Sequence, residues 1–497
     1  MESTYVQFKS RLTTQVYYLT IDINNKYMLT TMPTRGTRLD EIRYVAASGA
    51  LGVGVDAEAL NKSLDLRPHF IASDAGTTDA GPFALGSGDA AFPREAVKRD
   101  LTRVLVASRK ANIPALIGSA GTAGADSHVE WVLGIAREIA EENNLSLRTA
   151  VIRSEQDPNY LSTLYREGRI RALDPAPEID AAVFANSAHI VGMMGVEPLQ
   201  AALEAGADFV LAGRCSDPAL FAALPILRGF PPGLAWHAGK VTECGTMACE
   251  GGHGGVITAT VREHEVILRP VGAGLRCTPQ SIAAHSLYEN AHPYLHKECS
   301  GTLDLTHSKY TAVDDASVRI TGSEFIPATD YTVKLEGAEL VGYQSLMIGG
   351  IRDPFILRRL DHWLAEVKTY IYRVAERVLS LRPEDWTLTV HVYGRNAVMG
   401  ALEPNASEMP HEVGIDVEAT ASTQDLATKA AQLSRQPFLH HGAPEWTSGS
   451  TSFACLHNPA HINRGAVYRF NLNHVAVPRN KTEMFRTEFV QIGGAGR

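Results

Sequence analysis

Short apolar runs alternate with helix-like segments from about residue 42 onward, and this alternation limits the fold more than any other feature of the sequence. The runs lie at residues 43–47, 70–72, 115–117, 150–152, 181–184 and 209–211. Between them, residues 93–111, 128–143 and 198–205 place apolar side chains at helical spacing. Strands that alternate with helices of this length form right-handed βαβ units. The sequence therefore predicts an α/β fold with a mainly parallel sheet flanked by helices.

Other regions depart from this alternation. Residues 256–340 contain short β-prone pieces separated by Gly, Asp and Pro, and they predict a β-rich insertion of antiparallel strands packed against the sheet. Residues 381–497 predict a smaller C-terminal α/β module, so that the main α/β domain covers residues 41–380. Residues 1–40 lack the apolar segment of a signal peptide and carry several acids, and we expect them to be a poorly ordered extension.

Nearly every predicted strand ends in Ser, Asp, Thr or Gly. The carboxyl ends of parallel strands meet at one edge of a sheet, where loops and helix N-termini bind ligands. Small and hydroxyl side chains at that edge leave room for a ligand and supply contacts to it. The predicted substrate-binding residues are Ser48, Gly49, Thr77, Thr78, Gly121, Thr122, Arg214, Ser216, Gly251 and Gly252. Taken singly, each of these loops also fits an ordinary turn between a strand and a helix.

Carboxylates in the same loops indicate acid–base chemistry. The predicted catalytic acids and bases are Asp74, Asp79, Asp217 and Glu243. Burial and neighbouring charges can separate the pKa values of such carboxyl groups, so that one acts as acid and another as base. Arg214 is suited to hold a substrate carboxylate or phosphate through its planar guanidinium. These residue types favour proton transfer next to a carboxylate or thioester, as in a hydratase, lyase or isomerase.

Two other functions fit the same residues. Ser119 or Cys244 could be the nucleophile of a hydrolase, with a histidine from the loops of residues 256–340 as its base. Ser119 stands in a Gly-Ser-Ala-Gly stretch that departs from the GxSxG nucleophile elbow, and its hydroxyl also fits the cap of the following helix. Alternatively, the chain could be a non-catalytic subunit of a degradative complex, with its polar loops lining an interface.

Cofactor motifs are absent from the sequence. Gly49, Gly52 and Gly54 depart from the GxGxxG spacing of dinucleotide sites, and no GxxxxGK[ST] nucleotide loop occurs. The CxxC and HExxH spacings of zinc sites do not occur either. We therefore predict no cofactor, and leave open a divalent metal ion held by Asp74, Asp79 and Asp217.

Charge, cysteines and hydropathy limit the partners of the chain. A formal net charge of -9 argues against broad electrostatic capture of nucleic acid. Six scattered cysteines without a secretory leader indicate reduced thiols and a cytoplasmic protein. No apolar run approaches the roughly 20 residues needed to cross a bilayer, so we expect no membrane partner. Large enzymes of this type commonly form homo-oligomers, and we expect one here.

Three segments in order carry a resemblance to a known family. They are SDPAL at residues 216–220, HAGKVTECGTMACEGG at residues 237–252 and VGYQSLMIGGIRDP at residues 341–354. Over roughly residues 42–377 the chain resembles the acyclic terpene utilisation (AtuA) family, whose members show a DPA-type loop, a G-x-x-x-E-C-G segment and a late GGIRDP-type turn in this order. The resemblance implies bacterial catabolism of acyclic terpenoids and other branched carboxylates, often beside acyl-CoA enzymes. It therefore implies a small carboxylate or its acyl-CoA as the substrate.

The C-terminal part departs from this family pattern. Many relatives carry, or are accompanied by, a small ferredoxin-like domain with an ARSGDKG-type segment, which is not found in this sequence. The module at residues 381–497 is expected either to cover the site or to receive a small companion subunit.

Overall fold

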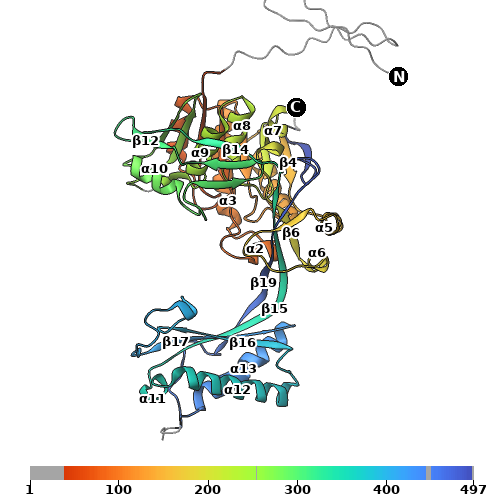
Figure 1. Ribbon diagram of the computed structural model, residues 1–497, viewed down its shortest axis with the longest axis vertical. Coiled ribbons are helices and arrows are strands. Elements are labelled where there is room, and N and C mark those ends of the chain that lie inside the picture. Colours follow the sequence, from red (N-terminus) through yellow and green to blue (C-terminus); the bar gives the residue numbers. More distant parts are fainter. Residues whose placement is uncertain (1–38, 253, 444–448, 495–497) are drawn as a thin grey trace, which may run out of the picture.

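The computed structural model describes residues 39–252, 254–443 and 449–494. The extension expected at residues 1–40 lies almost entirely outside the described residues. The chain forms a large lobe and a small lobe, and Figure 1 shows two long strands, β15 (Val333–Ile351) and β19 (His461–Ala476), running between them. Among the described residues, no helix is both long and apolar enough to traverse a lipid bilayer.

A ten-stranded mixed sheet forms the centre of the large lobe, in the order β12-β13-β9-β8-β1-β2-β3-β7-β4-β20. The central strands are parallel, and they are β1 (Ile42–Ala46), β2 (Phe70–Asp74), β3 (Ala115–Gly118), β7 (Phe209–Ala212) and β4 (Ser146–Arg153). The flanking strands are antiparallel, and they are β8 (Val256–Val261), β9 (Val266–Val271), β13 (Val318–Thr321), β12 (Lys309–Ala312) and β20 (Arg486–Gly493).

The prediction of a mainly parallel sheet is therefore wrong, while the α/β class is confirmed. β8 pairs with β1 in antiparallel register, with Ala46 opposite Ile257, and the β8–β9 hairpin continues the same sheet. Strands joined by short turns run antiparallel, so hairpins added to a free edge turn a parallel sheet into a mixed one. Three further strands of residues 256–340 form a separate small sheet after α10 (Pro279–Ser286), and they are β10 (Leu295–Glu298), β11 (Gly301–Asp304) and β14 (Glu324–Pro327).

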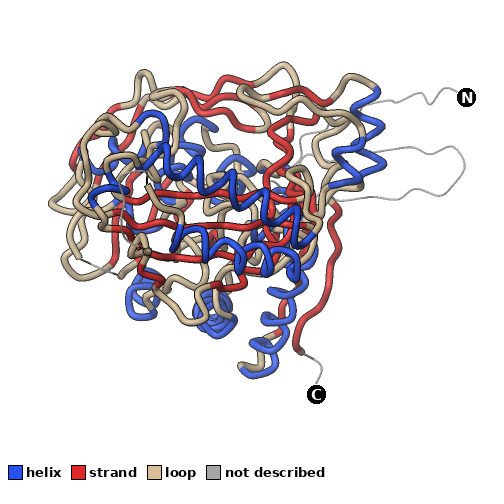
Figure 2. The backbone as a smooth tube through the Cα atoms, turned by 90° about the horizontal axis from the view of Figure 1, so that it is seen from below, coloured by secondary structure: helices blue, strands red, loops and turns tan. Residues whose placement is uncertain are grey.

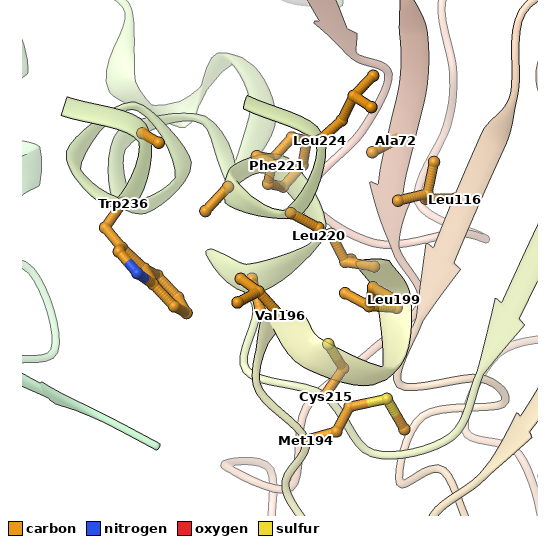
Figure 3. Close-up of a cluster of buried hydrophobic side chains, with 14 of the residues drawn as sticks. Ala72, Leu116, Met194, Val196, Leu199, Cys215, Leu220, Phe221, Leu224 and Trp236 are labelled. Atoms are coloured by element: carbon orange, nitrogen blue, oxygen red, sulfur yellow. The ribbon is translucent and has the colours of Figure 1, made fainter. Parts of the chain in front are cut away.

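Successive side chains of the parallel strands point to opposite faces of the sheet, and each face is buried in its own apolar cluster. In β7, Val210 belongs to one cluster and Phe209 to the other. The first cluster contains side chains of α7 (Val196–Glu204), α8 (Ala219–Leu227) and α9 (Pro232–Thr242), and Figure 3 shows Leu220 of α8 in it together with Leu116 of β3. The second contains side chains of α1 (Ala57–Ser63), α3 (Arg94–Ala111) and α4 (Asp126–Glu142). Helices on both faces leave the carboxyl edge of the parallel strands free to carry loops.

The strand expected at residues 181–184 is instead a helix, α6 (Ala182–Asn186). A short apolar run does not by itself distinguish a strand from a buried helical turn. The ring of Phe184 is buried and packs against Tyr165 of α5 (Pro158–Arg166), with 6.0 Å between the ring centroids. The nearby strands are β5 (Ile170–Ala172) and β6 (His189–Gly192), and they pair with β19 and β15 rather than with the large sheet.

The small lobe is an antiparallel sheet packed against two long helices. β17 (Val413–Ala421) lies between β15 and β16 (Trp386–Tyr393), and β18 (Ala454–Cys455) also pairs with β15. Figure 2 shows long helices beside the strands, and α12 (Leu360–Leu379) and α13 (Gln424–His440) share a buried core with them through Trp363 and Phe438. Short helices α2 (Phe83–Ser87) and α11 (Pro354–Leu357) complete the element order.

The lobes do not divide at the residue expected from the sequence. The core of the small lobe includes α12, which precedes residue 381, and excludes β20, which returns to pair with β4 of the large sheet. The strand β15 belongs to both lobes, because it pairs with β6 near its start and with β17 near its end, and β19 pairs with it along most of its length. The chain thus leaves the large lobe along β15, forms the small lobe, and returns to the large lobe along β19.

Candidate active site

The loops that follow β1, β2, β3 and β7 meet at one edge of the large sheet. The main-chain N–H of Leu51 donates to the carbonyl of Asp74 at 3.0 Å, and that of Ser119 donates to the carbonyl of Gly213 at 2.9 Å. The Ser73 hydroxyl donates to the carbonyl of Ser48 at 3.1 Å. Parallel pairing holds the strand ends at one level, so loops that are far apart in the sequence become neighbours.

Glycines in these loops let the loops pack on each other. A Cβ atom at Gly49 would lie 2.8 Å from the carbonyl oxygen of Cys244, and one at Gly121 would lie 2.7 Å from Cβ of His128. Gly76 has a φ of +147°, and its Cβ would lie 2.4 Å from Cα of Thr122. Neighbouring loops and the start of α4 therefore fill the space beside these three glycines.

Gly124 provides a test of this loop packing. Its φ is +71°, and a Cβ there would lie 2.1 Å from the main-chain N of Arg214. We expect Gly124→Ala to lower the free energy of unfolding by more than about 1 kcal/mol, because alanine must adopt a left-handed conformation and displace a neighbouring loop. Urea unfolding followed by circular dichroism measures the change. The matched control is Gly134→Ala within α4, where a Cβ meets nothing within 4 Å; it should stabilise the helix by roughly 0.5–1 kcal/mol.

A cluster of charged side chains lies at this edge, and we call it the carboxyl cluster. Its members are Asp74, Asp217, Glu243, Glu298, Glu336, Arg214 and Lys240. Each of the five carboxyl groups interacts electrostatically with another charged member. Two of the seven side chains are cations, and Lys334 adds a third beside Glu336, so the five carboxyl groups outnumber the cations that can pair with them. This excess of negative charge favours the protonated form of the carboxyl groups that lack a cation.

The sequence predicts that Arg214 binds a substrate carboxylate or phosphate. In the structure, Arg214 is instead paired with side chains of the protein. Its Nε donates to Oε2 of Glu336 at 2.9 Å, and its Nη2 lies 3.5 Å from Oε1 of the same carboxylate. Both residues are 4% exposed. A third nitrogen, Nη1, donates to the Ser119 hydroxyl at 3.1 Å and lies 3.4 Å from Oδ1 of Asp217. Arg214 therefore fixes the positions of three elements around the cluster.

The carboxyl groups of the cluster have widely separated pKa values. Burial alone would raise the pKa of Glu336, but Arg214 and Lys334 outweigh it and lower that pKa to about 2. Burial raises the pKa of Asp217 to about 6, against the opposing charge of Arg214, and raises the pKa of Glu298 to about 8. The pKa of Asp74 is raised well above its usual range by burial and by the charge of Asp217.

Glu243 is likewise a carboxyl group whose pKa is raised. Burial raises its pKa well above the usual range, although Lys240 donates a hydrogen bond to Oε1 and opposes the shift. The other oxygen of Glu243, Oε2, and Oδ1 of Asp74 are both buried, and neither has a hydrogen-bond partner within the described part of the chain. Because buried polar atoms normally find partners, these two oxygens are suited to bind a group supplied by a ligand.

Asp217 lies where the cluster opens. Its side chain is 27% exposed, whereas that of Glu243 is 3% exposed and that of Glu336 is 6% exposed. The exposed carboxylates of Asp79 and Glu289 act electrostatically on Asp217. The site thus combines one accessible carboxylate that is mostly ionised at neutral pH with less accessible carboxyl groups, Glu243 and Asp74, whose pKa values are raised well above their usual range.

Close helix packing brings Lys240 and Glu243 to the cluster. Both lie at the C-terminal end of α9, three residues apart on one face. A Cβ at Gly239 would lie 2.5 Å from the carbonyl oxygen of Pro218, so α9 can approach the start of α8, next to Asp217, only with glycine at that position. Lys240 stands in the same GKVTECG segment as Glu243, but the sequence pattern singles out only Glu243 as a candidate acid or base.

Two further members of the cluster gave no signal in the sequence. Glu298 ends β10 and accepts from the Ser216 hydroxyl at 2.8 Å, across 82 positions of sequence. Glu336 lies within β15 and pairs with Arg214 across 122 positions. A single glutamate in a β-prone segment looks like an ordinary solvent-facing residue until the strand is placed in three dimensions.

The nucleophiles expected for a hydrolase are poorly placed for that chemistry. The Ser119 hydroxyl is buried and accepts from Arg214, and no described histidine hydrogen-bonds to it. The pKa of Cys244 is raised to about 12 by burial and by Glu243, so its thiol stays protonated. Burial and the charge of Lys240 lower the pKa values of His285 and His296 to about 4. The thiolate and general base that such a mechanism needs are not provided by these residues.

The remaining predicted binding residues have structural partners or lie elsewhere. Thr78 donates to Oε2 of Glu336 at 3.1 Å, and so belongs to the edge of the carboxyl cluster. The hydroxyls of Ser48, Thr77 and Thr122 make hydrogen bonds within their own loops or to Ala91. Gly251 and Gly252 lie on the surface against Ala273 and Gly274.

Within residues 39–252, 254–443 and 449–494, no three His, Cys, Asp or Glu side chains are grouped to hold a metal ion.

Glu298 should make the stability of the protein fall as pH rises. Its pKa is about 8 in the folded protein, against 4.5 as the ordinary value. Between these values the folded state keeps a proton that the unfolded state has released, so ionisation opposes folding. We expect Glu298→Gln, which mimics the protonated acid, to reduce the loss of unfolding free energy between about pH 5 and about pH 8. Urea unfolding at both pH values measures it, and the exposed Glu58→Gln is the control.

An unchanged pH slope in Glu298→Gln would contradict the raised pKa of this carboxyl group. A slope that flattens equally in the Glu58→Gln control would show a general effect of charge removal.

The comparisons with known proteins give one match. The family model described as "Acyclic terpene utilisation family protein AtuA" matches residues 86–454, which is most of the chain. No curated protein and no solved structure matches the chain.

Proposed function

The chain belongs to the acyclic terpene utilisation family, and we propose that it is a catabolic enzyme that transfers protons beside the carbonyl group of an acyclic terpenoid or branched acyl substrate. The reaction class is that of a hydratase, lyase or isomerase. The observation that carries this proposal is the carboxyl cluster, in which Asp217, with a pKa of about 6, stands beside Glu298, with a pKa of about 8. Neighbouring carboxyl groups with separated pKa values can serve as base and acid at the same pH.

In the proposed reaction, the carboxyl groups of the cluster act as base, hydrogen-bond donor and acid. The ionised Asp217 removes a proton from the carbon next to the carbonyl, and the electron pair of the broken C–H bond moves toward the carbonyl oxygen. Protonated Glu243 or Asp74 donates a hydrogen bond to that oxygen through its unpaired carboxyl group. Glu298 then gives its proton to a departing hydroxyl, which leaves as water and creates a double bond. The reverse sequence adds water, and proton return to another carbon gives isomerisation.

The charge at the opening favours a thioester over a free acid. The exposed carboxylates of Asp79 and Glu289 act on Asp217 at the mouth of the site, and Arg214 is already paired with Glu336. A free carboxylate would be repelled there and would find no unpaired guanidinium. A thioester carbonyl carries no charge and has a more acidic adjacent C–H bond. At the reacting group, a thioester such as that of an acyl-CoA therefore fits the electrostatics of the cluster better than a free acid, and the phosphates of CoA would have to lie away from Asp79 and Glu289.

Deuterium exchange tests the proposal without knowledge of the final product. The protein is incubated in D₂O with a panel of acyclic terpenoid and branched acids and their CoA thioesters, and the compounds are analysed by mass spectrometry. Proton transfer predicts deuterium in the acyl group, or gain or loss of water, for at least one thioester. Release of free CoA would instead favour a hydrolase, and no change in any compound would favour a non-catalytic subunit.

A further inference from the structure

Two cysteines lie directly opposite each other in a short antiparallel pair near the site. Glu250 and Arg276 form a β-bridge, in which Glu250 N donates to Arg276 O at 2.8 Å and Arg276 N donates to Glu250 O at 3.0 Å. Cys249 precedes Glu250 and Cys277 follows Arg276, so antiparallel pairing places these two cysteines opposite each other. Their sulfur atoms are 3.7 Å apart.

The pairing is of the kind in which two side chains approach most closely. Because Glu250 and Arg276 exchange both hydrogen bonds, the next pair along must be a non-hydrogen-bonded pair, whose Cα atoms are typically about 4.5 Å apart. The main-chain N–H groups agree with this, since that of Cys249 donates to Thr246 and that of Cys277 donates to Ala316. Neither N–H points to the opposite cysteine. The expected Cα separation lies within the range that a disulfide spans.

We infer that Cys249 and Cys277 form a reversible disulfide when the protein is exposed to a thiol oxidant, and that this pair is a redox modification site. The two thiols also differ in access. Cys277 is 2% exposed, whereas Cys249 is partly exposed and reachable from solvent. Cys249 therefore reacts first, and Cys277 resolves the intermediate.

The chemistry balances with a small disulfide such as oxidised glutathione. The Cys249 thiolate attacks one sulfur of glutathione disulfide, which forms a mixed disulfide and releases one glutathione thiolate. The Cys277 thiol then gives its proton to the released glutathione thiolate, and its sulfur attacks the Cys249 sulfur, which breaks the mixed disulfide and releases the second glutathione as a thiolate. Two protein thiols are oxidised and one glutathione disulfide is reduced to two thiols.

A disulfide between Cys249 and Cys277 would lie at the base of the β8–β9 hairpin. The segment between the cysteines contains the β8–β9 hairpin, which extends the large sheet from β1. Cys249 ends the short turn of residues 245–248 that directly follows Glu243 and Cys244. The disulfide would fasten the base of the hairpin and restrict the segment that leads away from the carboxyl cluster.

The test is disulfide mapping on the full-length protein. The purified protein is incubated with oxidised glutathione, free thiols are blocked by alkylation, and peptides are identified by mass spectrometry. We expect a peptide pair linked through Cys249 and Cys277, and a fall from six titratable thiols to four in the denatured protein. Added dithiothreitol should restore all of them, and the oxidised form should melt at a higher temperature than the reduced form.

Single serine variants separate this assignment from general oxidation. Cys277→Ser should trap glutathione on Cys249, whereas Cys249→Ser should leave the buried Cys277 unmodified. Cys455→Ser, at a partly exposed cysteine in the small lobe, should still form the linked pair. Alkylation of both Cys249 and Cys277 after oxidant treatment, or linkage of either to a third cysteine, would overturn the inference. Neither outcome bears on proton transfer in the carboxyl cluster, so the two proposals fail independently.

Discussion

Replacing Asp217 by asparagine is expected to lower kcat for proton transfer by about 10²- to 10⁴-fold, the usual contribution of a general base. Asparagine keeps the shape of the side chain but cannot accept a proton from carbon. The fold should not suffer, because the pKa of Asp217 is raised to about 6 and its ionised form is therefore unfavourable in the folded protein. Deuterium uptake into the responsive thioester gives the rate, and urea unfolding gives the stability of the same preparation.

The pH profile of the wild-type enzyme supplies an independent check on this assignment. As pH falls through about 6, Asp217 takes up a proton and the rate should fall. As pH rises through about 8, Glu298 loses its proton and the rate should fall again if it is the acid. Asp217→Asn should remove the acid limb of this bell-shaped curve.

Asp315→Asn is the matched control for Asp217→Asn. Asp315 is exposed in the turn between β12 and β13, away from the carboxyl cluster. The control variant should keep the wild-type rate and pH profile. If Asp217→Asn also keeps its rate, or if it loses the rate only together with its folded structure, Asp217 is not the base.

Replacing Arg214 by methionine is expected to lower the free energy of unfolding by about 3–5 kcal/mol, because it leaves the buried Glu336 without its buried cation and with only the half-exposed Lys334 as a partner. Glu336 is 4% exposed and its pKa is held at about 2 mainly by Arg214. Stability that depends on an ionised Glu336 is present above its ordinary pKa of 4.5 and is lost as pH falls through about 2. The deficit of the variant should therefore be largest near neutral pH and shrink in acid. Urea unfolding over this pH range measures both.

Two further variants define what the Arg214 result means. Arg171→Met removes a surface ion pair with Asp330, whose side chains are 55% and 46% exposed, and should cost no more than about 1 kcal/mol. The double variant Arg214→Met, Glu336→Leu removes both buried charges and should recover part of the lost stability. A deficit in Arg214→Met no greater than that of Arg171→Met would show that the buried pair is not what holds the loops together.

Local sequence patterns were sufficient to predict the positions of the strands and helices that form the parallel core. The strands expected at residues 43–47, 70–72 and 209–211 lie within one residue of β1, at the start of β2 and within β7. Helix spacing likewise located α3 to within one residue of its start. These elements are set by the periodicity of a few neighbouring side chains, which the sequence displays directly.

The mixed sheet could not be deduced in the same way. The strand pieces of β8 and β9 were visible as β-prone segments, but nothing in their residues says that Ala46 will face Ile257 across the free edge of β1. Pairing between strands is a long-range event, and several edges compete for the same hairpin. The prediction of a strand at residues 181–184 is wrong for a related reason, because the burial of Phe184 in α6 depends on what packs over it.

By itself, the sequence determined the α/β class, the parallel core and the carboxyl groups of Asp74, Asp217 and Glu243, because strand ends and polar loops are local features. Only the tertiary structure decided that Glu298 and Glu336, from distant strands, join them, and that Arg214 is bound to Glu336 rather than free for a substrate. The same is true of the protonation of the cluster. A pKa depends on burial and on the charges that surround a group in space, and neither exists until the chain is folded.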